Sequence, residues 1–247
     1  MKKFLKVFAC LFLLFALTIG IYCVFTWPRI PAHIYGYKGF SLHRQGKYEE
    51  AINSYTKAIE LNPKSVAMFY NWRAEPKIEI GDYVGAEEDI KHAIELEPNF
   101  CNHYCALADL KIDLEQYQEA LLNINKAIDL CNPKDEVYNV QGIIKRKLKD
   151  YEGAVVAFTK AIELNPKNLG PYFNRAYAKN NLKDYEGALA DYNYVLENIS
   201  KDTLISKEET PFYMERVYRA RAEVKRNLGD EQGAQNDENK ANELLSK

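Results

Sequence analysis

The sequence repeats itself with a period of 34 residues from about residue 32 to its end. Alanine recurs every 34 or 35 residues, until an interval of 46 residues precedes the last one. A tyrosine stands sixteen residues before each of these alanines, and a glycine or alanine twelve residues before. The alanines are Ala51, Ala86, Ala120, Ala154, Ala188 and Ala234, and the tyrosines are Tyr35, Tyr70, Tyr104, Tyr138, Tyr172 and Tyr218. Such a period predicts a stacked array of similar units.

Each repeat has the pattern of two helices joined by a short turn. Apolar residues at helical spacing fill two windows per repeat, such as 138–148 and 154–164, with a polar turn at 149–152 between them. A proline follows the second window in four repeats and blocks its continuation. A single helical hairpin cannot bury its apolar face, whereas a stack of hairpins can. We therefore predict an all-α solenoid.

The order of aromatic residue, Leu-Gly, Tyr, Ala, Phe and Pro resembles the tetratricopeptide repeat (TPR) family. The resemblance implies a right-handed superhelical solenoid of about six TPR hairpins over residues 32–247. The expected repeats are about 32–66, 67–100, 101–134, 135–168, 169–200 and 212–247, with an insertion at 198–211. The last helix, 231–245, is polar on most faces, which suits a terminal cap that water must wet.

A hydrophobic segment precedes the repeats. Residues 7–25 carry no charge and would span roughly 28 Å as a helix, close to the thickness of a bilayer core. Three lysines precede this run, so we expect a basic tail and a transmembrane signal-anchor helix over 1–27, followed by a short linker at 28–31. The lysines predict a single-pass membrane protein with extracytoplasmic repeats, as on a bacterial inner membrane facing the periplasm or outside. The alternative is signal cleavage after Gly20, which would release a secreted or periplasmic protein.

Composition and motifs argue against nucleic-acid binding and catalysis. Thirty-three Lys and Arg against 35 Asp and Glu give a net charge of −2, which disfavours a nucleic-acid partner. There is no Gly-rich phosphate loop, and the four histidines do not combine with an acid and a nucleophile. We therefore expect no enzyme activity and no cofactor. We also expect no metal site, because Cys101 and Cys105 share a helical face that His103 does not. The sequence leaves undecided whether Cys101 and Cys131 form a disulfide.

The resemblance implies that the first helices of the hairpins line a concave groove, in which a protein or peptide segment binds. Acidic side chains gather in the second and third repeats, and basic side chains in the fourth and sixth. The expected groove residues are Tyr37, Phe40, Asn71, Trp72, Glu75, Glu79, Asp109, Asp113, Asn139, Arg146, Phe173, Asn174, Tyr177, Arg216 and Arg219. The bland alternative is that these are ordinary solvated side chains.

The second repeat is the strongest candidate for a ligand contact. Trp72 lies in its first helix, and Pro76 follows inside the same helix, where proline removes a hydrogen bond and predicts a bend. The nearby Glu75, Glu79, Asp109 and Asp113 would add a negative wall, so we expect a partner segment that carries Lys or Arg beside an apolar anchor. The alternative is a tolerated kink, with Trp72 partly covered by its neighbours.

Some TPR proteins hold the acidic tails of chaperones with a clamp of Lys and Asn, then Asn, then Lys and Arg on three successive repeats. Asn174 and Arg216 match two of these positions. Asn139, Ile143 and Ala220 stand at the other three, so we do not expect this clamp here.

Overall fold

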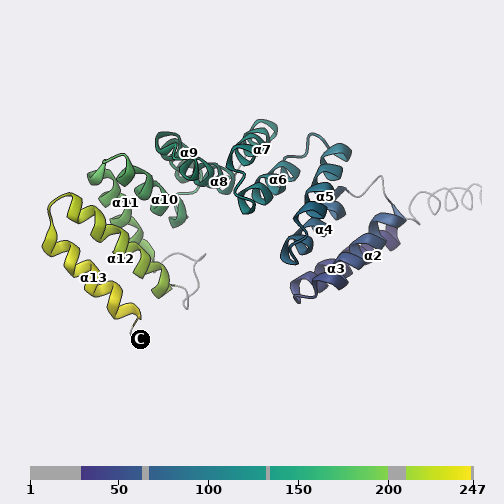
Figure 1. The fold of residues 1–247 in the computed structure, drawn as a ribbon, viewed down its shortest axis with the longest axis horizontal. Helices are drawn as coiled ribbons and strands as arrows, with labels where there is room; N and C mark the ends of the chain where they lie inside the picture. Colours follow the sequence, from purple (N-terminus) through teal and green to yellow (C-terminus); the bar gives the residue numbers. More distant parts are fainter. Residues whose placement is uncertain (1–28, 63–66, 132–133, 200–209, 246–247) are drawn as a thin grey trace, which may run out of the picture. The chain divides into compact units, whose positions relative to one another are not determined.

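A computed structural model describes residues 29–62, 67–131, 134–199 and 210–245, and within these ranges the chain forms twelve α-helices and no strand (Figure 1). The expected membrane anchor over 1–27 lies outside the described residues. Among the helices that are described, none is both long and apolar enough to cross a bilayer.

The chain divides into two compact units, and the boundary between them falls within one helix. The N-terminal unit ends at Leu110 and contains α2 (Arg29–Arg44), α3 (Tyr48–Leu61), α4 (Ala67–Glu79), α5 (Tyr83–Leu96) and most of α6 (Cys101–Asp113). The C-terminal unit contains α7 (Tyr117–Leu130), α8 (Asp135–Lys147), α9 (Tyr151–Leu164), α10 (Leu169–Asn181), α11 (Tyr185–Asn198), α12 (Thr210–Asn227) and α13 (Glu231–Leu245).

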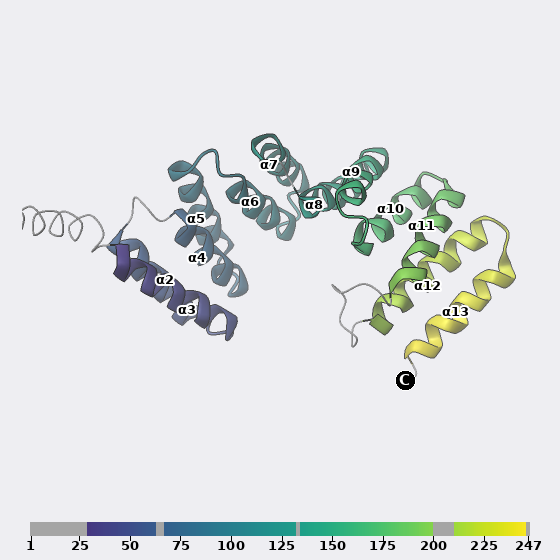
Figure 2. The ribbon, with the colours of Figure 1, turned by 180° about the vertical axis from the view of Figure 1, so that it is seen from behind.

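Within each unit, helices pair as antiparallel hairpins that stack on one another. In the N-terminal unit α2 packs on α3 and α4 on α5, while α3 contacts α4 and so joins the two hairpins. In the C-terminal unit the pairs are α8–α9, α10–α11 and α12–α13, and both views show α12 and α13 side by side (Figures 1 and 2). Five of the predicted helical hairpins are thus confirmed within the two units.

Glycine and aspartate in the turns explain where the first helix of a hairpin ends and the second begins. Gly81 ends the turn after α4 in a left-handed conformation, with φ of 82°, which glycine adopts at no steric cost. Asp82 then caps α5, because its side chain accepts a hydrogen bond from the backbone N–H of Gly85 at 3.0 Å. Asp184 caps α11 in the same way through Gly187.

The small-residue columns mark where two helices approach closely. The repeating alanines from Ala51 to Ala188 are fully buried. A methyl group added at Gly142 in α8 would lie 2.5 Å from the ring of Phe158 in α9, too close for any real contact. The register that the alanine period predicts is therefore the register of the structure.

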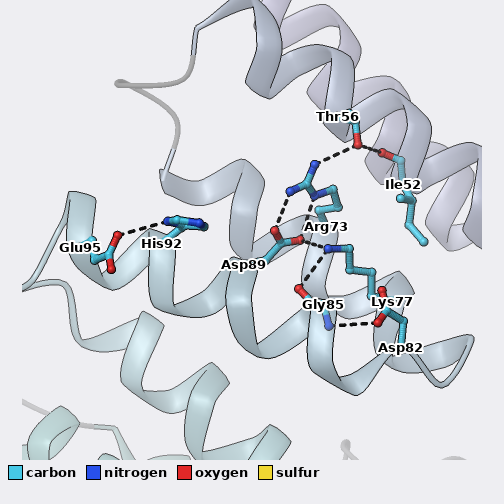
Figure 3. A network of polar contacts seen from close by, with 9 residues as sticks. All are labelled: Ile52, Thr56, Arg73, Lys77, Asp82, Gly85, Asp89, His92 and Glu95. Carbon is cyan, nitrogen blue, oxygen red and sulfur yellow. Dashed lines mark hydrogen bonds and ion pairs between the residues drawn. The ribbon is translucent and has the colours of Figure 1, made fainter.

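A buried ionic network ties each of three hairpins together, and Figure 3 shows the one between α4 and α5. The Arg73 guanidinium donates to both carboxylate oxygens of Asp89, at 2.6 and 2.8 Å, and Lys77 approaches the same carboxylate at 2.9 Å. Arg73 also donates to Thr56 of α3, at 2.9 Å, and so links this hairpin to the preceding one. The same Arg, Lys and Asp arrangement recurs in the C-terminal unit at Arg175, Lys179 and Asp191, and at Arg221, Lys225 and Asp237.

Some boundaries differ in detail from the expected ones. Helix α2 begins at Arg29, so most of the expected linker is helical, and Pro31 falls in the first turn, where a missing N–H is tolerated. Helix α12 begins at Thr210, inside the expected insertion, most of which lies outside the described residues. Helix α4 continues through the buried Pro76 to Glu79.

Candidate functional site

The N-terminal unit has a groove of about 480 Å³ between α4 and α6. Residues of α4 and α6 form most of its lining. The lining residues are Met68, Asn71, Trp72, Ala74, Glu75, Ile78, Ile90, Phe100, Asn102, His103, Cys105, Ala106 and Asp109. Four of the expected groove residues are therefore brought together here: Asn71, Trp72, Glu75 and Asp109.

Trp72 packs against the hydrophobic core and also lines the groove. Its ring centroid lies 5.6 Å from that of Phe69, 6.0 Å from Phe40 and 6.3 Å from Tyr55, so aromatic neighbours cover part of the indole. The remaining part faces the groove. The alternative of partial cover is thus observed, and it leaves an apolar surface that is fixed in place by its neighbours.

Negative charge is concentrated on the walls of the groove. Glu75 on α4 and Asp109 on α6 both line it, and none of its lining residues is Lys or Arg. Burial raises the pKa of Glu75, while His43, whose Nδ1 lies 3.5 Å from the carboxylate, opposes this shift. Burial and the charge of Asp109 raise the pKa of the Cys105 thiol, so Cys105 stays neutral beside the acids.

Polar contacts link Asn71 on α4 to His103 on α6, and His103 to Glu97, the residue that follows α5. His103 is fully buried, and its Nδ1 lies 2.6 Å from Nδ2 of Asn71 on α4. Its Nε2 lies 3.3 Å from Oε2 of Glu97, at the end of α5. Burial lowers the pKa of His103, and Glu97 opposes this effect only in part. The Oδ1 atom of Asn71 is buried and has no hydrogen-bond partner.

The other expected residues of the N-terminal unit do not line this groove. Tyr37 and Phe40 lie on α2 with 66% and 44% of their surface exposed, and Phe40 reaches the groove only through its contact with Trp72. Glu79 is exposed at the end of α4. Asp113 is exposed at the end of α6 and belongs to the C-terminal unit.

In the C-terminal unit, six of the expected residues contact one another in pairs between α8 and α10 and between α10 and α12, and we call this set the C-terminal strip. Nδ2 of Asn174 lies 3.4 Å from Oδ1 of Asn139. The Arg146 guanidinium stands 5.0 Å from the centroid of the Tyr177 ring, and its Nε is buried without a hydrogen-bond partner. The Arg216 guanidinium stands 5.5 Å from the Phe173 ring. Arg219 pairs instead with Glu215 and with Asn242 of α13.

The sequence reasoning missed His103 as part of the groove. It occupies the repeat position at which Phe69 stands one repeat earlier. A polar residue in an otherwise apolar column is the signal that could have identified it. The Arg, Lys and Asp columns of the buried ionic networks carry the same kind of signal, because each is a polar residue that recurs at one repeat position.

Metal-ligating side chains do not gather in the described ranges: no group of three His, Cys, Asp or Glu residues there could hold an ion. Cys101 and Cys131 are both disulfide-bonded, and Cys105 is a free thiol. Cys10 and Cys23 lie outside the described residues.

Comparison with known sequences identifies the repeats. Tetratricopeptide-repeat profiles match residues 32–65, 104–133, 136–168 and 157–190. The chain is 35% identical over 86 residues to the Hsp70-Hsp90 organising protein of Plasmodium falciparum (isolate 3D7), a match that covers 33% of this chain and 15% of that protein. It is 43% identical over 60 residues to small glutamine-rich tetratricopeptide repeat-containing protein 2 of Mycosarcoma maydis, covering 24% of this chain and 17% of that one. The chain thus contains tetratricopeptide repeats and spans less than a fifth of these curated relatives.

Solved structures share the fold at low sequence identity. Pseudomonas aeruginosa PilF has a TM-score of 0.70 and 16% identity, covering 85% of this chain and 90% of that one. YrrB, described as a TPR protein with an unusual peptide-binding site, has a TM-score of 0.62 and 19% identity, covering 77% of this chain and 91% of that one. These likenesses show an all-helical TPR solenoid fold.

Proposed function

We propose that this protein is a noncatalytic, membrane-tethered interaction scaffold whose N-terminal unit binds a peptide or helical segment in the α4–α6 groove. The segment carries Lys or Arg beside an apolar side chain. The observation that carries this proposal is the combination of Trp72, packed against aromatic neighbours, with two carboxylates and no basic side chain among the lining residues.

The groove offers both parts of such a contact. A positive side chain between Glu75 and Asp109 would make charge-assisted hydrogen bonds, which are roughly twice as strong as neutral ones. An apolar neighbour would bury the exposed surface of Trp72, Met68 and Phe100, and buried aromatic anchors provide most of the binding energy at typical interfaces.

The strip on the C-terminal unit supports a second contact of opposite charge. Arg146 and Arg216 are the cations in it, Asn139 and Asn174 supply amides, and Phe173 and Tyr177 supply aromatic surface. We propose that this strip binds acidic groups of the same class of partner. Arg146 in particular has a buried N–H that a carboxylate could satisfy.

Relatives support peptide binding more than they support a particular partner. YrrB is described as having a peptide-binding site, and two curated relatives are Hsp70-Hsp90 organising proteins. The positions of the chaperone-tail clamp are occupied here by Asn139, Ile143 and Ala220, so the proposal does not extend to that ligand.

The membrane tether rests on sequence alone. The uncharged run at 7–25 with three lysines before it supports a retained anchor with extracytoplasmic repeats. The alternative is a secreted or periplasmic protein, released by cleavage after Gly20.

Four peptide pools test the ligand class. Each pool is random except for a fixed central residue, which is Arg, Lys, norleucine or Glu, and retention on the immobilised full chain in detergent is measured. We expect the Arg and Lys pools to be retained more than the norleucine pool when the C-terminal strip is disabled by Arg146→Ala and Arg216→Ala. Retention of all four pools to the same extent would overturn the proposal.

A further inference from the structure

We propose that the α4–α6 groove distinguishes arginine from lysine, with Asn71 as the specificity-determining residue and His103 as the residue that positions it. This inference rests on the proposed function, which predicts a basic side chain in the groove but not which one.

The hydrogen-bonding role of the Asn71 amide follows from its neighbours. The carboxylate of Glu97 accepts a hydrogen bond, so Nε2 of a neutral His103 carries the proton and Nδ1 is an acceptor. The atom of Asn71 that faces Nδ1 at 2.6 Å must then be the donor, Nδ2. The Oδ1 atom is left as a buried acceptor without a partner in the wall of the groove.

An unpaired buried acceptor favours a ligand that brings an N–H group. Leaving such an atom unsatisfied is unfavourable, and a bound donor would remove that cost. The free groove shields Oδ1 from water, so an entering side chain must displace part of the lining to reach it. Met68 is an exposed, unbranched side chain in that lining and can move at little cost.

The spacing of Asn71 and Glu75 points to arginine. The two residues are one helical turn apart and line the same groove, so an amide oxygen and a carboxylate stand next to each other on one face of α4. A guanidinium presents five N–H donors in a rigid planar fork and can address both acceptors at once. An ammonium carries its three N–H donors on a single nitrogen, which must itself lie within hydrogen-bond distance of both acceptors, whereas the guanidinium divides the two contacts between different nitrogens.

His103 sets this selectivity through its protonation state. A protonated ring donates from Nδ1, so the Asn71 amide must turn, and Nδ2 then faces the groove and opposes an arginine. The titratable groups around His103 are Glu97 from the end of α5, Cys105 on α6, and the groove carboxylates Glu75 and Asp109. Glu75 and Asp109 still attract positive charge after the Asn71 amide has turned. The groove should therefore still prefer Arg and Lys over an uncharged side chain.

The Arg and Lys pools test this inference on the full chain carrying Arg146→Ala and Arg216→Ala. At pH 7.5 we expect about tenfold greater retention of the Arg pool over the Lys pool, the size of one charged hydrogen bond. Asn71→Leu should equalise the two pools, whereas Asn71→Gln, which keeps both the amide donor for His103 and the amide acceptor, should retain more of the preference than Asn71→Leu does. Asn53→Leu, an exposed asparagine of α3 outside the groove, is the matched control and should leave the ratio within twofold.

Two further measurements separate a positioning role of His103 from a structural one. The ratio of Arg-pool to Lys-pool retention should fall as the pH drops through the pKa of His103. Both pools should still be retained more than the norleucine pool. In His103→Gln the ratio should no longer depend on pH in this range. Nitrogen-15 NMR at pH 7.5 should show His103 protonated at Nε2 only. A proton on Nδ1, or equal retention of the Arg and Lys pools by the chain that carries only Arg146→Ala and Arg216→Ala, overturns the inference and leaves the proposed function intact. Failure of both pools to exceed norleucine overturns both.

Discussion

Arg73 and Asp89 lie sixteen residues apart and are joined across their hairpin by two hydrogen bonds, of 2.6 and 2.8 Å. The same spacing joins Arg175 to Asp191, and Arg221 to Asp237. Burial opposes ionisation of Asp237, but hydrogen bonds from Arg221 and Lys225 outweigh it and hold the pKa of that carboxyl below its usual value. These pairs fix the two helices of a hairpin in one register.

Replacing Asp89 by Ala should strongly destabilise the N-terminal unit. The change leaves the guanidinium of Arg73 and the ammonium of Lys77 mostly buried without their shared partner. Removing one partner of a buried pair costs about 3–5 kcal/mol in the free energy of unfolding, which urea denaturation would measure. The control is Glu163→Ala, which breaks the exposed pair with Lys160 and should cost less than about 1 kcal/mol. Equal losses would show that the Arg73–Asp89 pair is not structural.

Replacing Ala120 by Leu should overpack the repeat. Ala120 is fully buried in α7, so three added carbons have no space, and we expect a loss of about 1–3 kcal/mol. Ala190→Leu makes the same change at an exposed position of α11 and should stay within about 0.5 kcal/mol. If the two variants had the same melting temperature, the assigned register would be wrong.

His103 should make the protein less stable in mild acid. Its pKa in the folded state is below the ordinary value of 6.5, so the unfolded chain takes up a proton first as the pH falls. The contribution of His103 to stability should therefore decline below about pH 6.5 and level off below its folded-state pKa. Unfolding of the parent chain and of His103→Gln at pH 7.5, 6.0 and 5.0 would measure this, with His92→Gln, at an exposed histidine, as the control. A decline that persists in His103→Gln but disappears in His92→Gln would contradict the assignment.

The N-terminal segment should keep the protein in the membrane. The full chain should stay with the membrane fraction after carbonate extraction, and a chain lacking residues 1–27 should not. Protease added to intact spheroplasts should digest the repeats. A mature protein that begins at Ile21, or repeats that resist the protease, would contradict the proposed anchor and orientation.

Sequence periodicity was sufficient for the hairpins and their register, because residues such as Ala154 and Gly142 have one structural reason to be small. It also grouped Asn71, Trp72, Glu75 and Asp109, since the same repeat positions face the same groove. It could not show that Phe40 contacts Trp72 or that His103 contacts Asn71. Those contacts depend on how neighbouring hairpins stack, and a single sequence gives only the order of residues within each hairpin.

Reversing the charge of the α4–α6 groove tests the central claim most directly. The variant Glu75→Lys with Asp109→Lys should be compared with the parent chain for retention of the Arg and Glu peptide pools, both carrying Arg146→Ala and Arg216→Ala. Circular dichroism should first show that the helical content is unchanged. We expect the parent to prefer the Arg pool and the charge-reversed variant to prefer the Glu pool, each by about tenfold. A variant that is folded and retains both pools as the parent does would show that this groove is not the binding site.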